Sequence, residues 1–148
     1  MPVVRELSAD ETSLAHPAMS ELRPAFTSVS EFTLRVNQVQ RSEGYRLLGS
    51  FNDVDNDAVA AAGFRAGHNL AWGHYVYVDD LVTCAAHRGQ GHADALMGWL
   101  FEEAVQMGCD QLHLDSGTHR LEAHRFYFKH DLTISSFHFT SGSLKGKR

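Results

Sequence analysis

Residues 76–93 read VYVDDLVTCAAHRGQGHA, and their pattern is the most informative feature of the sequence about the fold. Its first part alternates polar and apolar residues, which predicts a strand over Val76–Cys84 that runs into a glycine-rich turn. Beyond the turn, apolar residues recur at three- and four-residue intervals, as on one face of an amphipathic helix: Ala93, Leu96, Met97, Leu100, Phe101, Ala104 and Met107. Gly108 stands where such a helix would end. Because a helix start presents unpaired N–H groups and a positive dipole end, the stretch predicts a phosphate-binding turn.

The composition of the turn narrows the kind of phosphate site. Gly89 and Gly91 would let the backbone approach an anion, and Arg88 could add a charge-assisted hydrogen bond. Such turns are also common as purely structural features, so the neighbouring residues must decide. A P-loop is excluded because no Gly-Lys-Ser/Thr follows, and Asp94 occupies the place of the third glycine of a dinucleotide fingerprint. The arrangement that remains is Arg88-x-x-Gly91-x-Ala93.

The rest of the chain supplies strands and helices on both sides of this stretch. Before it, we expect a strand, two helical stretches separated by Pro24, and two further strands: Val3–Leu7, Asp10–Leu22, Ser28–Gln40, Tyr45–Phe51 and Ala58–Ala66. After it, we expect a strand, a helix and a closing strand: Gln111–Asp115, Arg120–His130 and Ile134–Thr140. The order indicates a mixed α/β sheet with a central meander rather than a doubly wound sheet, in one domain over residues 1–148.

Charge and cysteine content exclude several classes of protein. The 148 residues include 13 basic and 18 acidic ones, a net charge of −5, which does not favour a nucleic-acid partner. Cys84 and Cys109 lie far apart in apolar segments, unlike a disulfide framework or a zinc-ligand pattern. We find neither a signal-like start nor a run of about 18 apolar residues, so we expect a cytoplasmic protein without a membrane partner.

The order and spacing of these motifs resemble the GNAT superfamily, whose acetyl-CoA motif reads Gln/Arg-x-x-Gly-x-Gly/Ala between a strand and a helix. Leu81-Val82-Thr83 matches the family strand that pairs with pantetheine, and residues 123–127, Ala-His-Arg-Phe-Tyr, match its second cofactor helix. The resemblance covers about residues 75–132. It implies a GNAT-type mixed, mostly antiparallel sheet of six to seven strands flanked by about four helices.

The resemblance also implies a single acyl-CoA N-acyltransferase domain that uses acetyl-CoA as co-substrate. Its contacts would come from the pantetheine strand, the glycine-rich turn and the second helix: Leu81, Val82, Thr83, Arg88, Gly89, Gln90, Gly91, His92, Ala93, Arg120 and His124. Two residues depart from the family pattern. Arg120 stands where many members carry an asparagine, which puts one cofactor contact in doubt, and Asp131 replaces the usual glycine, which suggests a different exit from the helix.

Two residues are candidates for proton transfer in the acetylation of an amine. Tyr127 resembles the family tyrosine that faces the thioester sulfur, which implies a general acid; the alternative is an ordinary aromatic on a buried helix face. Alternation along the strand sends Asp79 and Asp80 to opposite faces, so only one can face the acceptor. Asp80 stands near where the family often places an acidic residue that draws a proton through water. Its alternatives are a loop carboxylate, a turn hydrogen bond or a solvated charge.

The remaining steps of the reaction have weaker signals in the sequence. The N–H group of Leu81 or Val82 is the candidate oxyanion donor. Neither cysteine has a base partner at motif level, so we expect direct attack rather than an acyl-enzyme. Besides a cofactor contact, His124 could influence the acidity of Tyr127, which lies three residues away on the same helix.

Ten histidines raise the possibility of a metal site. The best combination, His113, Asp115 and His119, is a weak three-ligand set, and such histidines are more often structural, so we predict no metal.

The acceptor, the oligomeric state and the class of function remain open on the sequence alone. The aromatic candidates for an acceptor pocket are Phe26, Phe32, Trp72, Tyr75 and Tyr77, and the acidic ones are Glu21, Glu31 and Glu43. They fit a primary amine of a small molecule or a peptide without distinguishing between them. Phe137 and Phe139 on the closing strand favour a homodimer. The alternative function is a non-catalytic acyl-CoA-binding regulatory module.

Overall fold

The computed structural model describes residues 1–53 and 56–146, which form two compact units, Met1–Leu114 and Asp115–Arg148. None of the helices in these described residues has the length and apolar character needed to cross a membrane.

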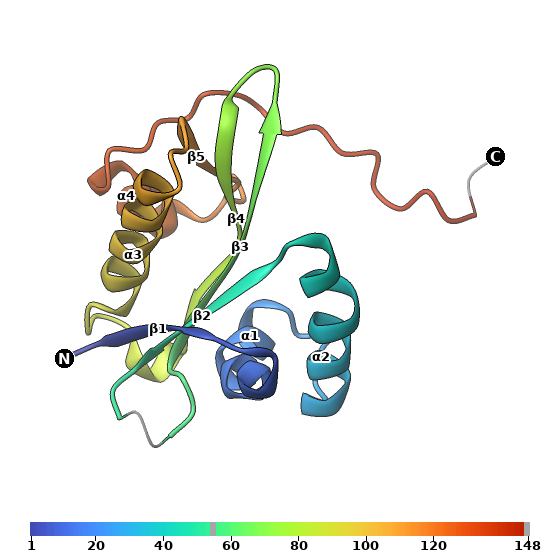
Figure 1. Cartoon of the computed structure of the whole chain (residues 1–148), viewed down its shortest axis with the longest axis vertical. Coiled ribbons are helices and arrows are strands. Elements are labelled where there is room, and N and C mark those ends of the chain that lie inside the picture. Colours follow the sequence, from blue (N-terminus) through green and yellow to red (C-terminus); the bar gives the residue numbers. More distant parts are fainter. Residues whose placement is uncertain (54–55, 147–148) are drawn as a thin grey trace. The chain divides into compact units, whose positions relative to one another are not determined.

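The first unit is built on one five-stranded sheet (Figure 1). Its strands lie in sequence order: β1 (Val3–Leu7), β2 (Arg46–Phe51), β3 (Ala60–Asn69), β4 (Gly73–Thr83) and β5 (Gln111–Leu114). The first three pairings are antiparallel, and only β4 and β5 run parallel. The expected mixed, mostly antiparallel sheet and its central meander are therefore confirmed.

Both of the long N-terminal helices expected from the sequence are divided. The first becomes a 3₁₀ segment, η1 (Ala9–Ala15), followed by α1 (His16–Leu22), which begins with proline in its first turn. The second is α2 (Val29–Arg35), which continues as a π-helical turn, η2 (Val36–Gln40), and a 3₁₀ turn, η3 (Arg41–Glu43).

The helix after the glycine-rich turn forms as predicted. A short 3₁₀ turn, η4 (Ala85–His87), leads from β4 toward α3 (His92–Gln106). Gly108 follows the last turn with a φ of 75°, the left-handed conformation that glycine adopts readily at a helix end.

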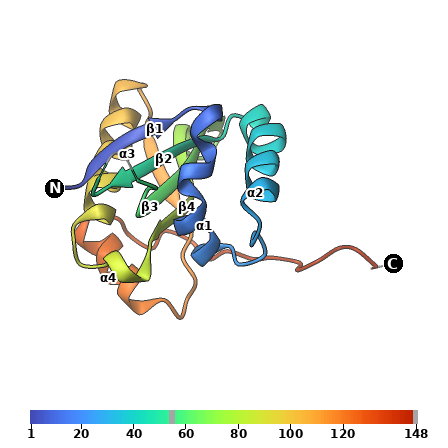
Figure 2. The ribbon, with the colours of Figure 1, turned by 90° about the horizontal axis from the view of Figure 1, so that it is seen from below.

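The sheet of the first unit is covered on both faces, with α3 on one face and α1 and α2 on the other (Figure 2). On the α1 face the core includes Leu7, Ala15, Ala18, Met19, Phe32, Val36, Tyr45, Leu47, Phe51, Ala58, Ala61 and Cys84. On the α3 face Phe64 is fully buried, and its ring meets that of Trp99 edge-on at 6.0 Å. Because side chains alternate along a strand, Leu47 of β2 points to the α1 face, whereas Leu48 and Ser50 point to the α3 face.

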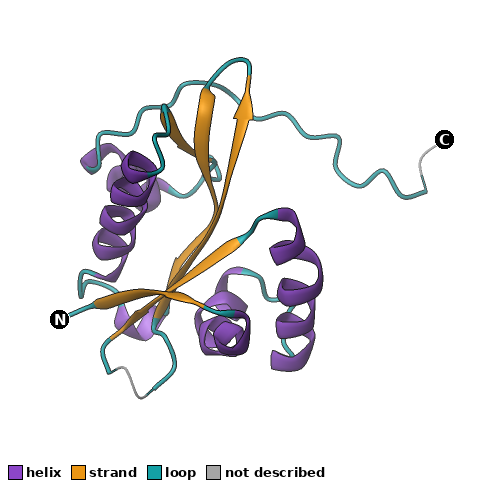
Figure 3. Ribbon diagram, in the orientation of Figure 1, coloured by secondary structure: helices purple, strands orange, loops and turns teal. Residues whose placement is uncertain are grey.

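The described part of the second unit contains one helix, α4 (Leu121–Lys129), and an extended C-terminal segment (Figure 3). The strand expected over Ile134–Thr140 is not formed, so the prediction of six to seven strands was wrong and the sheet has five. A strand is defined by hydrogen bonds to a neighbour, and the described part of this unit offers this segment no second strand. The residues that the structure describes form four α-helices, as expected.

The end of α4 also differs from the expectation. Asp131 has a φ of 62°, the only positive φ of a non-glycine residue among those described. The helix therefore ends in the left-handed conformation that a glycine would supply, and not by a different exit.

Candidate active site

The sheet of the first unit opens between β4 and β5. The two strands pair only from Tyr75 opposite Gln111 to Val78 opposite Leu114. Beyond Val78, β4 continues to Thr83 while pairing with β3 alone. One edge of β4 is thus left without a strand partner in this unit, next to the point where the chain enters the glycine-rich turn.

A β-bulge lies where this open edge begins. Gly63 pairs with Asp80, but the next residue, Phe64, pairs with Val78, so that Asp79 is an extra residue on β4. A bulge interrupts the regular alternation of side chains along a strand.

The bulge changes which backbone groups face the open edge. The His74 carbonyl accepts a hydrogen bond from the Asp110 N–H at 2.6 Å, which places it on the β5 side. With regular alternation the backbone groups of Cys84 would face the same side as those of His74. Instead, the Cys84 N–H bonds the Val59 carbonyl on the β3 side at 2.8 Å, because the extra residue shifts the alternation by one. In this register Leu81 and Thr83 turn their N–H and C=O groups toward the open edge, whereas Val82 faces β3.

The bulge also places two carboxylates on one face, contrary to the expectation of opposite faces. Phe64 packs toward α3, so Arg65 points to the other face, where its Nε and Nη2 both donate to Asp79 at 2.8 Å. Asp80 lies beside Tyr45, which belongs to the core on the α1 face. Regular alternation was the wrong assumption, because Asp79 is the extra residue of the bulge.

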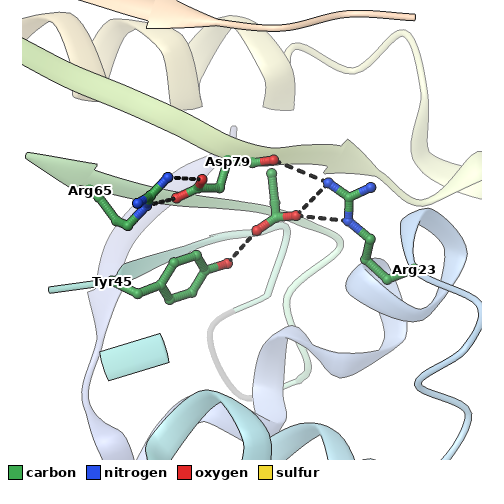
Figure 4. A network of polar contacts seen from close by, with 5 residues as sticks. Arg23, Tyr45, Arg65 and Asp79 are labelled. Atoms are coloured by element: carbon green, nitrogen blue, oxygen red, sulfur yellow. Dashed lines mark hydrogen bonds and ion pairs between the residues drawn. The ribbon is translucent and has the colours of Figure 1, made fainter. Parts of the chain in front are cut away.

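Asp80 is held by two donors from distant parts of the chain, Arg23 and Tyr45, which are labelled in Figure 4. Arg23, just after α1, lies 2.8 Å from Asp80 Oδ1 through Nη2, and this guanidinium also donates to the Asp79 carbonyl at 3.1 Å. The Tyr45 hydroxyl donates to Asp80 Oδ2 at 2.8 Å. Only 13% of the Asp80 side chain is exposed, so its carboxylate is both sheltered and fixed in orientation.

The Tyr45 hydroxyl occupies space that only a glycine leaves open. A Cβ on Gly63 would lie 1.7 Å from the Tyr45 oxygen. Burial, and then the negative charge of Asp80, raise the pKa of Tyr45 well above its usual value. Tyr45 is therefore a neutral, permanent hydrogen-bond donor to Asp80.

The glycine-rich turn has the backbone conformation that the sequence suggested. Gly89 and Gly91 have φ values of 77° and 88°, and Gly91 is the N-cap of α3. Space is not the reason for these glycines, since a Cβ on Gly91 would approach only Pro2, at 3.8 Å. No side chain caps α3, so the first N–H groups of a 15-residue helix point out of the turn without a capping side chain.

His92 has a different place from the one expected of a cofactor contact. Its side chain is 1% exposed and lies beneath the turn, where Nδ1 is 2.7 Å from Ser50 Oγ and Nε2 is 2.9 Å from Asn52 Oδ1. Burial, followed by the positive charges of His87 and the chain's N-terminus, lowers the pKa of His92. Only the backbone of His92 belongs to the surface of the turn.

The other side chains expected around the turn differ in exposure. Arg88 and Gln90 are exposed, and Gln90 Oε1 accepts a hydrogen bond from Asn52 Nδ2 at 3.1 Å. Ala93 is partly buried in the first turn of α3.

The second unit holds the candidates on α4. Arg120 is the N-cap residue, and the His124 ring bonds the Gly117 carbonyl at 2.8 Å rather than Tyr127. Burial raises the pKa of Tyr127, and the nearby Arg120 opposes this shift. A tyrosine with a raised pKa keeps its proton at neutral pH, as a proton donor must.

The described residues contain no cluster of three or more histidine, cysteine, aspartate or glutamate side chains that could hold a metal ion.

Comparison with known proteins identifies the family. The model of the acetyltransferase (GNAT) family matches residues 13–131. The chain belongs to the GNAT family. An uncharacterized N-acetyltransferase of Bacillus subtilis, YhdJ, is 30% identical over 133 residues, which cover 89% of this chain and 92% of the relative.

Solved structures share the GNAT fold at low sequence identity. A transcriptional regulator from Bacillus halodurans superposes with a TM-score of 0.81 at 18% identity, covering 95% of this chain and 98% of the other. AAC(6′)-Iy, solved with the bisubstrate analog CoA-S-monomethyl-acetylneamine, has a TM-score of 0.80 at 10% identity and covers 95% and 96%.

The residues that support the candidate site from a distance could not be predicted from the sequence. Arg23, Tyr45, Ser50 and Asn52 belong to no motif, because their role comes from tertiary contacts. Gly63 had a usable signal, since an isolated glycine inside a strand often marks a bulge or a close approach.

Proposed function

We propose that the protein is an N-acetyltransferase that transfers the acetyl group of acetyl-CoA to a primary amine of a small molecule or peptide. The observation that carries this proposal is the continuity of the open β4 edge with the turn at the start of α3. The edge offers hydrogen bonds to an amide-containing arm, and the turn offers N–H groups to a pyrophosphate.

Acetyl-CoA would be held mainly by the backbone. Leu81 and Thr83 would bond the pantetheine amides, and the N–H groups from Gly89 to Ala93 would bond the pyrophosphate. Arg88, exposed at the edge of the turn, would add a charged contact. The family match and the CoA analog bound to AAC(6′)-Iy support this assignment.

The chemistry would proceed by direct attack of the amine on the thioester carbonyl. A C–N bond forms, the C–S bond breaks, and the Leu81 N–H stabilises the developing oxyanion. The proton lost by the amine would pass to Asp80, directly or through a water molecule. Tyr127 would donate its proton to the departing thiolate, which is possible because burial keeps the pKa of Tyr127 raised and its hydroxyl protonated at neutral pH.

Arg23 and Tyr45 would orient Asp80 and still leave it able to accept a further hydrogen bond. Each carboxylate oxygen can accept two hydrogen bonds, so Oδ2, which accepts from Tyr45, keeps a lone pair for an amine or a water.

The test is acetyl transfer across a panel of small amines and peptide N-termini, following thiol release and acetylated product together. Tyr127→Phe and Asp80→Asn should each lower kcat by about 100-fold or more, because general acid–base catalysis contributes about that much. Both variants should bind acetyl-CoA as the wild type does, and the exposed Asp57→Asn should keep full activity. Unchanged turnover in both variants would contradict the assigned roles.

A non-catalytic acyl-CoA-binding regulator is the second candidate. It is favoured by the likeness to a structure described as a transcriptional regulator, and by the ion pair that engages Asp80. It predicts acetyl-CoA binding with no acetylated product from any amine in the panel.

We further propose that the chain acts as a single domain in the cytoplasm and forms a homodimer. The dimer rests on Phe137 and Phe139, which are 82% and 92% exposed in the C-terminal segment. Light scattering should give twice the chain mass for the wild type and the single mass for a Phe137→Ser/Phe139→Ser variant.

A further inference from the structure

The hydrogen bonds of His92 form a connected network beneath the glycine-rich turn. Ser50, which is fully buried on β2, meets Nδ1, and Asn52, just beyond β2, meets Nε2. Asn52 also reaches Gln90 in the turn at 3.1 Å and His87 before it at 3.3 Å. The network therefore joins the end of β2 to the residues before, within and after the turn.

The partners determine where the protons lie. Asn52 uses its carbonyl oxygen toward His92, so His92 Nε2 must carry the hydrogen and donate it. A neutral ring then has a bare Nδ1, which accepts the hydrogen of the Ser50 hydroxyl. With its oxygen engaged, Asn52 turns its NH₂ group toward Gln90 Oε1 and His87 Nδ1. Every polar atom of the buried imidazole is satisfied, and the orientation of Asn52 is fixed.

This arrangement makes the shape of the turn depend on His92. The glycines at 89 and 91 have left-handed backbones and no side chains to pack, so they do not hold the turn by themselves. The first N–H groups of α3 can bind an anion only if they point to the same place. The surroundings of His92 also disfavour a charged ring, because burial and then repulsion from His87 and the N-terminal ammonium lower its pKa.

We propose that His92 is a positioning residue that holds the turn over residues 88–93 in its anion-binding shape through Ser50 and Asn52. Its side chain acts from beneath the turn without touching the ligand. The inference rests on the proposed acetyl-CoA function, because the shape of the turn matters only if the turn binds the pyrophosphate.

The test compares variants that keep or remove the hydrogen-bonding atoms of His92. His92→Leu removes both, whereas His92→Gln keeps one donor and one acceptor. Asn52→Ala cuts the network at an exposed position, so it remains informative if His92→Leu does not fold. Thr12→Val is the matched control, since Thr12 is also fully buried and polar but bonds Asn37 and Arg41 instead.

The measurements are the Kd for acetyl-CoA by calorimetry, kcat and KM for transfer, and Tm. His92→Leu and Asn52→Ala should weaken acetyl-CoA binding about tenfold, the equivalent of roughly 1.4 kcal/mol, while kcat at saturation stays within about twofold. His92→Gln should recover most of the affinity. Thr12→Val should lower Tm and leave the Kd unchanged.

The outcomes separate this inference from the function on which it rests. Wild-type affinity in folded His92→Leu and Asn52→Ala, or a loss of kcat with an unchanged Kd, would overturn the positioning role. A wild type that binds no acetyl-CoA would overturn the proposed function instead. Amide exchange of the turn then decides the positioning role alone: faster exchange at residues 89–93 in the two variants supports it, and unchanged exchange refutes it.

Discussion

The two ends of the candidate site are supported in different ways. The turn at the start of α3 rests on a neutral network in which His92 is 1% exposed, and no side chain caps the first N–H groups of the helix. The bulge on β4 rests on ion pairs, with Arg23 and Arg65 about half exposed beside Asp80 and Asp79. Because the network under the turn is neutral, no charge in it offsets the positive end of the α3 dipole, which remains available to an anion. The ion pairs at the bulge instead hold two carboxylates in fixed orientations, as a proton transfer requires. This difference fits the proposed roles, in which the turn binds the cofactor and the bulge takes part in proton transfer.

The largest predicted effect comes from a negative charge in the turn, which tests whether the turn binds the cofactor. Gly91→Glu adds a side chain where φ is 88° and a carboxylate where the pyrophosphate is expected. We predict that acetyl-CoA binding falls more than about 100-fold, because strain and repulsion act together. Calorimetry measures the loss. Gly98→Glu is the matched control, since Gly98 lies on the same helix with open space around it, and this variant should keep wild-type affinity.

The next largest effect should come from filling the space under the bulge. Gly63→Ala would put a Cβ 1.7 Å from the Tyr45 oxygen, so Tyr45 must move away from Asp80. We predict a loss of about 1–3 kcal/mol in the free energy of unfolding, as in other overpacked cores, and a lower kcat with little change in the Kd for acetyl-CoA.

Tyr45→Phe separates the hydrogen bond from the packing in that experiment. It should cost about 1 kcal/mol of stability and also lower kcat, because the ring stays and only the donor to Asp80 is lost. Denaturant unfolding and transfer kinetics on the same samples check both effects. A kcat equal to that of the wild type in Tyr45→Phe would show that the orientation of Asp80 does not limit the reaction.

The neutral network should make the stability of the protein depend on pH through His92. The pKa of His92 is lowered on folding, so below about pH 6.5 the unfolded chain takes up a proton that the folded chain still excludes. The stability due to neutral His92 is present above this pH and is lost as the pH falls toward the folded pKa. The fall in Tm between pH 7 and 5 should therefore be smaller in His92→Gln than in the wild type, and equal slopes would contradict the assignment.

The same comparison explains what the sequence could predict. The turn, α3 and the strand before it are local patterns in which the spacing of glycines and apolar residues carries the information, and all three were predicted. The opposite faces expected for Asp79 and Asp80 failed because the extra residue of a bulge depends on pairing with β3, which no local pattern records. Arg23 and Tyr45 lie 57 and 35 residues from Asp80, so only the folded chain brings them together.

The C-terminal segment shows that an alternating pattern alone does not predict a strand. Alternation around Phe137 and Phe139 is typical of a strand, but a strand exists only with a partner to bond. The sequence of the segment alone does not determine whether a neighbouring strand is there to pair with it.

The smallest predicted effect concerns the end of α4. Asp131→Gly should raise the free energy of unfolding by about 0.5–1 kcal/mol, because glycine reaches a φ of 62° with less strain than aspartate. Denaturant titration measures it, and a destabilised variant would mean that the Asp131 side chain contributes more than its backbone strain costs.

The central claim, that the open edge of β4 and the turn before α3 form one acyl-CoA site, can be tested directly by following backbone amide shifts while labelled protein is titrated with acetyl-CoA. We predict the largest shifts at Leu81, Thr83 and residues 89–93, all saturating with the same Kd. Binding that leaves these amides unchanged, or that shifts the turn without the strand, would contradict the account.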